Sequence, residues 1–252
     1  MSADTKPNFM LQRVMVLAAG LGERMRPITD TLPKPLIELR GRTLLDSILD
    51  RAEAAGVPEA VVNLHYLGEM IEARLAQRSR PRPRISFSRE ETRLETGGGV
   101  CKALSLLGAE AFFVINGDVS WLDGHTPALV RLAAAWNEKE MDALLLLHPT
   151  AFAVGYAGIG DFVLAPDGRM RRRRESEVAP FVFTGIQILH PRLFEDAPEG
   201  PFSLNLIYDK AGAAERLWGL RHDGEWFHIG TPEGLREVED ALHPLSEISD
   251  QR

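Results

Sequence analysis

Near its N-terminus the chain reads "VMVLAAGLGERMRPITDTLPKPL", residues 14–36. The first four residues are apolar, which is typical of a strand buried on both faces of a parallel sheet. Gly20 and Gly22 follow, and glycines allow positive φ and let a ligand approach backbone N–H groups closely. Arg24 and Lys34 then add positive charge. The combination indicates a phosphate-binding loop at the carboxyl end of a strand, in preference to an ordinary strand-to-helix turn with solvated basic residues.

This loop differs from the two commonest phosphate loops. It lacks Gly-x-x-x-x-Gly-Lys-Ser/Thr, and Met25 stands where a dinucleotide fingerprint has its third glycine. It resembles instead the signature of the sugar-1-phosphate nucleotidyltransferases, whose matching residues here are Leu17, Ala18, Gly20, Gly22, Arg24, Pro27, Pro33, Lys34 and Pro35. The resemblance implies that Arg24 and Lys34 are catalytic. It also implies a nucleotide-binding loop of Leu17, Ala18, Ala19, Gly20, Leu21 and Gly22.

Composition and charge limit the class of protein. The 252 residues are 44% hydrophobic and 26% charged, as in a soluble globular protein with one large α/β domain. The net charge of -7 argues against binding a nucleic-acid polymer. Because no apolar stretch is long enough for a membrane span or a signal peptide, we expect a cytoplasmic protein with no membrane partner. The single Cys101 agrees with a reducing compartment.

Strands and helices are predicted to alternate after the opening strand. The predicted helices are 44–55, 68–78 and 100–107, and the predicted strands are 60–64, 85–88 and 111–116. This alternation indicates an α/β fold with a mostly parallel, doubly wound (Rossmann-like) sheet and helices on both faces. Ligands bind such sheets at the carboxyl ends of the strands.

The pattern changes to α+β in the second half of the chain. A strand is predicted over 142–149, a hairpin at the Pro-Asp-Gly of 166–168, and a helix over 232–242. We expect a disordered tail over 1–12 and a single domain over 13–245, with a nucleotide-side lobe at 13–141 and a smaller sugar-side lobe at 142–245. Many members of the resembling family carry a C-terminal β-helix; we expect none here.

The sequence "NGDVSW" places Asp118 two residues after a predicted strand. A carboxylate there can bind a hard cation, although Asx-Gly-Asp is also a common turn and the residues alone favour that structural role. The resemblance favours the metal. It implies that Asp118 is catalytic and coordinates Mg²⁺, with Mn²⁺ possible, and that Asn116 contacts the sugar.

Three consecutive glycines occur in "RLETGGGV", residues 93–100. Their N–H groups are free to approach a flat ligand edge, or the segment is a helix N-terminus capped by Thr96. In the resembling family this segment lines the base pocket, which implies nucleotide contacts for Glu95, Gly97 and Gly98. Glu95 replaces a glycine of the family pattern and leaves the identity of the base open.

The other candidate sugar-binding residues come from the second half of the chain. Asp161 stands beside glycines at the start of a predicted strand, where it can accept hydrogen bonds from hydroxyls or simply form a turn. The sequence "FVFTGIQIL" resembles the family strand whose Thr-Gly faces the sugar, although a plain core strand is the alternative. It nominates three sugar-binding residues, Thr184, Gly185 and Ile186. The arginine run 171–174 is typical of solvated charges on an edge strand.

The sequence "EWFHIGTPEGL", residues 225–235, departs from the family pattern. The family has Trp-x-Asp-x-Gly-Thr, in which the aspartate is the second metal ligand, and His228 stands at that position here. Imidazole is a poorer ligand than carboxylate for Mg²⁺ but suits Mn²⁺ and other transition metals. A water-bridged Mg²⁺, another metal and loss of activity are all compatible with His228.

The resemblance implies transfer of a nucleotidyl group from a nucleoside triphosphate to a sugar 1-phosphate, with release of pyrophosphate. The short length and the words "LAAGLGERMRPIT", "LETGGG" and "NGDV" look most like family members that join UTP to N-acetylmuramate 1-phosphate in bacterial peptidoglycan recycling. Mannose-1-phosphate guanylyl transfer and other hexose-1-phosphate nucleotidyl transfers are alternatives. A nucleotide-binding regulatory protein without turnover is an alternative of another class. We expect a monomer or a small homo-oligomer.

Overall fold

The structure of the protein is a computed structural model that describes residues 11–249, with side chains described as far as residue 243. The tail expected over 1–12 therefore lies outside the described residues, except for its last two. Of these, Leu11 is only 2% exposed and packs in the core.

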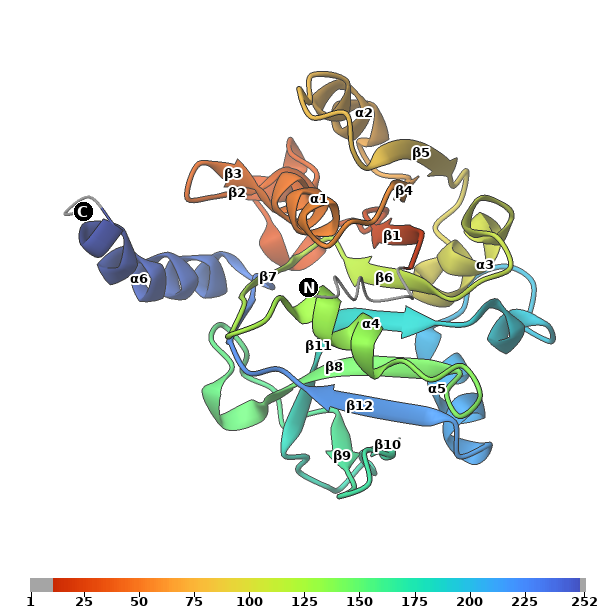
Figure 1. Cartoon of the computed structure of the whole chain (residues 1–252). Coiled ribbons are helices and arrows are strands. Elements are labelled where there is room, and N and C mark those ends of the chain that lie inside the picture. Colours follow the sequence, from red (N-terminus) through yellow and green to blue (C-terminus); the bar gives the residue numbers. More distant parts are fainter. Residues whose placement is uncertain (1–10, 250–252) are drawn as a thin grey trace, which may run out of the picture.

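A nine-stranded sheet organises the chain (Figure 1). Its strands are β1 (Arg13–Leu17), β4 (Glu59–Leu64), β5 (Arg84–Arg89), β6 (Phe112–Asn116), β8 (Ala143–Pro149), β9 (Phe162–Leu164), β10 (Met170–Arg172), β11 (Phe181–Leu189) and β12 (Leu217–Arg221). Strands β6, β1, β4 and β5 are parallel neighbours, and β8 and β12 form a second parallel pair. The mostly parallel α/β fold predicted from the apolar runs is confirmed. The hairpin expected near residue 167 is the antiparallel pair β9 and β10.

Strand β11 joins the two halves of the sheet. One edge pairs antiparallel with β6 over Ile186–Leu189 and with β9 at Phe181. The other edge pairs antiparallel with β8, with a register shift between Phe183 and Gln187. Two small sheets lie outside the main one: β2 (Glu38–Leu39) with β3 (Arg42–Thr43), and β7 (Val119–Leu122) with β13 (Glu225–His228).

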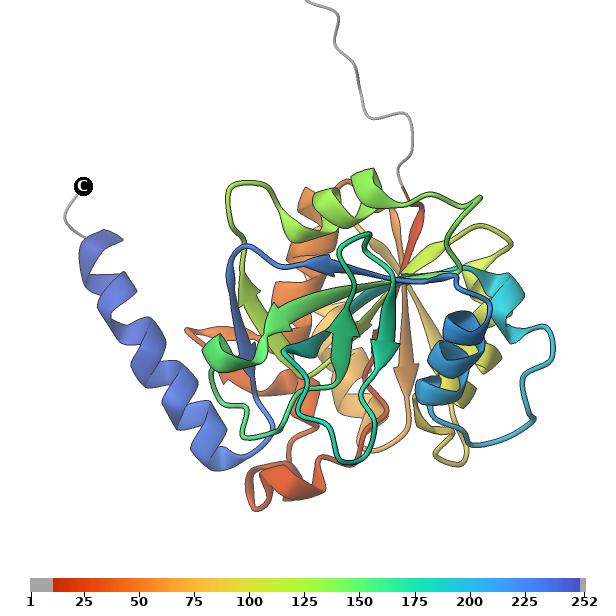
Figure 2. The ribbon, with the colours of Figure 1, turned by 90° about the horizontal axis from the view of Figure 1, so that it is seen from below.

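Helices cover both faces of the sheet (Figures 1 and 2). They are α1 (Leu44–Ala54), α2 (Gly68–Ala76), α3 (Glu95–Leu107), α4 (Ala128–Ala135), α5 (Leu204–Ala213) and α6 (Pro232–Ser249). Apolar side chains of α1, α2 and α4 pack in one core cluster, and those of α3 and α5 pack in another. Within residues 11–249 the strands form no β-helix. None of the described helices is long and apolar enough to cross a bilayer.

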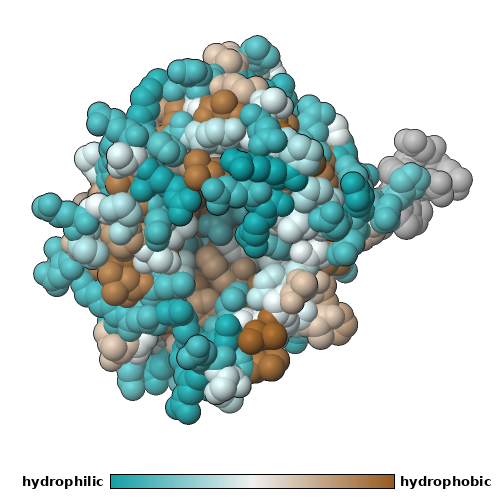
Figure 3. Space-filling model, turned by 180° about the vertical axis from the view of Figure 1, so that it is seen from behind, coloured by the Kyte–Doolittle hydropathy of each residue, from teal (hydrophilic) through white to brown (hydrophobic). Residues whose placement is uncertain are grey.

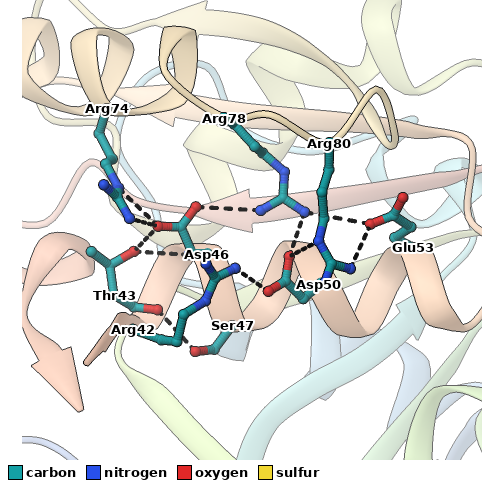
Figure 4. A network of polar contacts seen from close by, with 9 residues as sticks. All are labelled: Arg42, Thr43, Asp46, Ser47, Asp50, Glu53, Arg74, Arg78 and Arg80. Atoms are coloured by element: carbon teal, nitrogen blue, oxygen red, sulfur yellow. Dashed lines mark hydrogen bonds and ion pairs between the residues drawn. The ribbon is translucent and has the colours of Figure 1, made fainter. Parts of the chain in front are cut away.

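An ionic network fixes α1 against α2 (Figure 4). Asp46 in the first turn of α1 accepts hydrogen bonds from Thr43 at the N-cap and from Arg74, and it pairs with Arg78 at 3.3 Å. The side chains of Asp46 and Arg78 are each 4% exposed. Burial on its own would raise the pKa of Asp46, but these hydrogen bonds and the charges of Arg74 and Arg42 lower it. Asp46 is therefore an ionised, fully enclosed carboxylate.

Asp46→Ala is expected to destabilise the fold by about 3 kcal/mol, because it removes the buried carboxylate that pairs with both Arg74 and Arg78 and leaves Arg78 with Asp50 as its close partner. Urea unfolding at pH 7 measures the loss. Because the pKa of Asp46 is lowered in the folded state, its contribution is present above the ordinary aspartate pKa of about 3.9 and is lost as pH falls below it. Wild type and variant should therefore converge in acid. Glu72→Ala is the control: it removes an exposed pair with Arg89 and should cost at most about 1 kcal/mol.

Candidate active site

A cavity of 380 Å³ opens at the carboxyl ends of β1, β4 and β6. Figure 3 looks onto this end of the sheet and shows a hollow near the middle of the face. The cavity is lined by Leu17, Ala18, Ala19, Gly20, Lys34, Pro35, Asn63, Glu90, Arg93, Glu95, Thr96, Asn116, Gly117, Asp118 and Ser203. Its size suits a small ligand.

The strand order explains why the cavity forms here. The chain runs from β1 to β4 on one side and later returns to β6 on the other side of β1, so the loops at these strand ends diverge and leave a crevice. Gly117 holds the two loops together, since its N–H donates to the carbonyl of Leu17 at 2.9 Å. A Cβ at Gly117 would lie 2.7 Å from that carbonyl oxygen, so only glycine allows this approach.

Lys34 and Asp118 meet in this cavity, with Nζ 2.7 Å from Oδ2. Burial on its own would raise the pKa of Asp118, but the charge and hydrogen bond of Lys34 lower it. The charge of Arg24, and that of His228 when its imidazole is protonated, act in the same direction. Arg24 itself is exposed on the 3-10 turn η1 (Glu23–Met25). At neutral pH Asp118 is therefore an ionised carboxylate held beside the Lys34 cation.

The loop after β1 divides into two parts. Ala18, Ala19 and Gly20 line the cavity, and a Cβ at Gly20 would meet nothing within 4 Å, so its backbone is open to a ligand. Leu21 and Gly22 lie beyond the lining residues. The φ of +67° at Gly22 starts the η1 turn, and its carbonyl accepts a hydrogen bond from the Thr29 hydroxyl. Gly22 therefore shapes the loop.

A buried polar chain, which the sequence did not predict, supports the same loop. The N–H of Ala18 donates to Asn63 Oδ1 at 2.6 Å, and Asn63 Nδ2 donates to Glu90 Oε1 at 2.7 Å. Glu90 Oε2 accepts the N–H of Leu94 at 3.0 Å. Asn63 and Glu90 are 2% and 5% exposed. The one available signal was their position, a polar residue near the carboxyl end of β4 and another directly after β5.

The glycines of α3 serve packing. The N–H groups of Gly97 and Gly98 both donate to the carbonyl of Phe202, at 2.8 and 3.2 Å. A Cβ at Gly97 would lie 2.4 Å from the Phe202 ring, and one at Gly98 would lie 2.4 Å from the carbonyl oxygen of Gly200. The prediction that these N–H groups face a ligand is therefore wrong. They hold the segment before α5 against the start of α3.

Glu95 and Thr96 do line the cavity, and both are exposed. The predicted capping role of Thr96 is wrong, because α3 already begins at Glu95 and Leu94 is its N-cap. The Thr96 hydroxyl instead accepts the N–H of Leu204 at 3.0 Å. A base in this part of the cavity would meet the Glu95 carboxylate.

The structure separates the three residues nominated on β11. Thr184 and Ile186 are fully buried, and the Thr184 hydroxyl donates to the carbonyl of Leu146 at 2.8 Å. For these two side chains the core-strand alternative is correct and the sugar-facing prediction is wrong. Gly185, with φ of +79°, packs so closely that a Cβ would lie 2.9 Å from Nδ2 of Asn116, a lining residue.

Asp161 lies directly before β9 and is not among the residues that line the first cavity. It lines a second cavity, of 520 Å³, which it shares with Phe183 among others. One carboxylate oxygen, Oδ2, accepts the N–H of Phe183 at 2.9 Å. Burial raises the pKa of Tyr156, and the charge of the Asp161 carboxylate and a hydrogen bond to it act in the same direction.

His228 lies beside Asp118. It is paired with Val119, the residue after Asp118, in the register of β13 and β7. Burial lowers the pKa of His228 although the Asp118 carboxylate acts to raise it. The imidazole is therefore neutral near pH 7 and can offer a lone pair.

The contacts around His228 are also consistent with a packing role for its ring. Its ring stacks on Trp226 with centroids 5.8 Å apart and meets the edge of Tyr156 at 6.0 Å. A Cβ at Gly230 would lie 2.3 Å from His228 Nε2, so the ring fills the space that this glycine leaves.

The protein side chains of this site could hold a divalent metal only if substrate phosphates supplied further ligands. No group of three or more His, Cys, Asp and Glu side chains in the described part of the chain could hold a metal ion. Asp118, and His228 beside it, are the available protein donors. Mg²⁺ is commonly bound by one or two carboxylates together with substrate phosphates. The site matches that arrangement.

Comparison with known proteins identifies the family. A family model described as "Nucleotidyl transferase" matches residues 13–243. The chain is 42% identical to N-acetylmuramate α-1-phosphate uridylyltransferase of Caulobacter vibrioides, over 90% of this chain and 96% of that protein. It is 34% identical to the enzyme of the same name from Neisseria meningitidis serogroup B, with the same two coverages.

More distant relatives share the fold. Mannose-1-phosphate guanyltransferase beta-B of Xenopus laevis is 27% identical, over 87% of this chain and 61% of that protein. A solved structure of UDP-glucose pyrophosphorylase complexed with UDP-glucose superposes with a TM-score of 0.76 at 17% identity, covering 93% of this chain and 99% of the other. Since the family model spans nearly the whole described chain, the protein belongs to the nucleotidyl transferase family.

Proposed function

We propose that the protein transfers UMP from UTP to N-acetylmuramate 1-phosphate, giving the UDP-sugar and pyrophosphate. The observation that carries this is the Lys34–Asp118 pair, set in a cavity at the carboxyl ends of β1 and β6, in a chain 42% identical to a uridylyltransferase for that sugar phosphate. Nucleotidyl transfer to a sugar 1-phosphate is the activity of the family. The base and the sugar are the proposed part.

The reaction needs positioning and charge neutralisation more than covalent chemistry. A phosphate oxygen of the sugar 1-phosphate attacks the α-phosphorus of the triphosphate in line, and pyrophosphate leaves. Open backbone at Gly20 would hold the triphosphate, and the exposed Arg24 would offset charge on the leaving group. Lys34 would stabilise the α-phosphate as charge develops there. No protein nucleophile is required.

Enzymes of this family generally use a divalent metal, and we propose Mg²⁺. Asp118 would hold it together with substrate phosphates, and His228 is the candidate second ligand. The ion supplies neutralisation of phosphate charge. Residues 13–245 would act as one catalytic unit in the cytoplasm, with 13–141 serving the nucleotide and 142–245 the sugar.

His228→Asp tests the second ligand. If His228 is at the metal, the carboxylate should tighten Mg²⁺ binding, because it adds a negative charge and a hard oxygen donor. Wild type should favour Mn²⁺ over Mg²⁺ more strongly than the variant does. Calorimetric titration of each ion, with a non-hydrolysable UTP analogue present, measures this without turnover. Matching Mg²⁺ and Mn²⁺ affinities in the two proteins would show that His228 only packs between Trp226 and Gly230.

A pyrophosphate-release screen tests the proposed function. Four nucleoside triphosphates are crossed with a panel of sugar 1-phosphates, in Mg²⁺ and in Mn²⁺. We expect the highest kcat/KM for UTP with N-acetylmuramate 1-phosphate. A preference for GTP with mannose 1-phosphate would support the more distant relatives instead. Release from no pair, with nucleotide still bound, would support a regulatory protein, the reading that His228 motivates.

A further inference from the structure

A second cavity, of 520 Å³, is lined by Asp161, a residue that the family resemblance nominates for the sugar. Ser203 lines the catalytic cavity and Asn205, two residues later, lines this one. The remaining wall includes the aromatic rings of β9, β11 and α5 and four charged residues, Asp161, Arg172, Arg173 and Glu175. A ligand larger than a plain hexose phosphate would reach into it.

The arginines of this segment differ in how they are paired. Arg171 forms an ion pair with Glu177 at 2.7 Å, and Arg172 forms one with Asp209 at 2.6 Å. Arg173 instead donates Nη1 to the backbone carbonyls of Arg174 and Glu175, at 3.1 and 3.0 Å. Among the described residues no carboxylate lies within 4.0 Å of its guanidinium. Arg173 is thus a half-buried, oriented cation without a direct ion pair, in the wall of a cavity that also contains the carboxylates of Asp161 and Glu175.

Backbone pairing places Arg173 opposite Asp161. The β9–β10 register pairs Arg172 with Phe162, and the N–H of Arg173 donates to the carbonyl of Asp161 at 2.8 Å. Side chains of directly opposed residues lie on the same face of a hairpin. The charges of Asp161 and Arg173 both act on Tyr156, whose ring meets His228. Arg173 therefore lies on a line of residues that leads away from Asp118.

We propose that Arg173 binds a carboxylate carried by the sugar and so selects an acidic sugar 1-phosphate over a neutral one. The proposal rests on the proposed function, because N-acetylmuramate differs from N-acetylglucosamine only by a lactyl ether that ends in a carboxylate. Asp161, a carboxylate in the same cavity wall, would accept hydrogen bonds from hydroxyls of the ring. The Arg173 guanidinium has donors left over to form a charged hydrogen bond with the lactyl group.

The position of Arg173 suits discrimination. Its guanidinium is already fixed by backbone carbonyls, so little rotational freedom is lost when an anion binds. A neutral sugar would leave the guanidinium as it is in the free protein, at no penalty. The contact should therefore add affinity for the acidic sugar and leave the neutral one unaffected.

Arg173→Met is the test, with N-acetylmuramate 1-phosphate and N-acetylglucosamine 1-phosphate compared as acceptors for UTP. For the acidic sugar we expect kcat/KM to fall by about tenfold to a hundredfold, mainly through KM, because a charged hydrogen bond is lost in both ground and transition states. For the neutral sugar it should stay within about twofold. Arg174→Met is the matched control, because Arg174 is a neighbouring, exposed cation that lies outside the cavity. Its kcat/KM for each of the two acceptors should equal that of wild type.

Arg173 also ties its loop to backbone carbonyls, so Arg173→Lys is included to keep the charge while losing the planar fork. It should show a smaller loss, again confined to the acidic sugar. Equal losses with both acceptors in both variants would show a purely structural role, and an unchanged acidic-to-neutral ratio would overturn the proposal. Wild type that uses the neutral sugar and rejects the acidic one would overturn the proposed substrate itself, which is a separate result.

Discussion

Asp118→Asn is expected to lower kcat by about a thousandfold or more, the largest loss of any single change in this site. The amide keeps the shape of the carboxylate but loses the charge that holds a divalent cation. It also removes the ionic partner of Lys34, 2.7 Å away. Initial rates of pyrophosphate release, measured over a range of Mg²⁺ concentrations, give the loss.

Asp30→Asn is the control for this change, because Asp30 is an exposed carboxylate on a neighbouring turn, paired with Arg26. It should keep wild-type kinetics. Wild-type turnover of Asp118→Asn at ordinary Mg²⁺ concentration would remove Asp118 from the metal site. A loss that is fully restored by raising the Mg²⁺ concentration would place the whole effect in metal affinity.

Lys34→Ala is expected to lower kcat/KM by about a hundredfold to a thousandfold. Lys34 is only 9% exposed and pairs with Asp118. Its loss therefore removes the charge for the phosphates and also the charge that lowers the pKa of Asp118. The acid limb of the pH–rate profile should move to higher pH, since the freed carboxyl holds its proton longer.

Because Lys34 is buried, stability has to be measured beside activity. Lys34→Met keeps the volume of the aliphatic stem, so it should lose activity like Lys34→Ala while unfolding at a urea concentration closer to that of wild type. Arg26→Ala, with a side chain 63% exposed in the same segment of chain, should change neither property. Normal kcat/KM in Lys34→Met would exclude Lys34 from phosphate stabilisation.

The local sequence pattern was sufficient to predict the strands of the parallel half of the sheet and the loop after β1. Continuous apolar runs such as residues 111–116 are buried on both faces, and both their position and their direction follow from the alternation with helices. The helices α4 and α5 were not predicted. Both are ten residues or fewer, and their stability comes from packing on opposite faces of the sheet, which a short window of sequence does not record.

The candidate site likewise contains some residues that the sequence predicted and others that it did not. Lys34 and Asp118 belong to loops with a recognisable pattern, and 84 positions separate them in the chain. Asn63 and Glu90 belong to no such pattern, because their role depends on the register of β4 and β5. The sequence singled out the glycines of α3 but did not predict their role, because their contacts are with Phe202, more than a hundred residues away. Predicting those contacts requires the tertiary fold.

The position of strand β11 limits how far the two halves of the protein can move relative to each other. The strand is hydrogen-bonded to β6 in the first half of the chain and to β8 in the second, so a single sheet runs without interruption through both halves. Bending one half against the other would break a ladder of backbone hydrogen bonds, so the sheet opposes hinge motion between them. We therefore expect any closure over a ligand to come from connecting segments such as residues 18–33, three of which line the cavity.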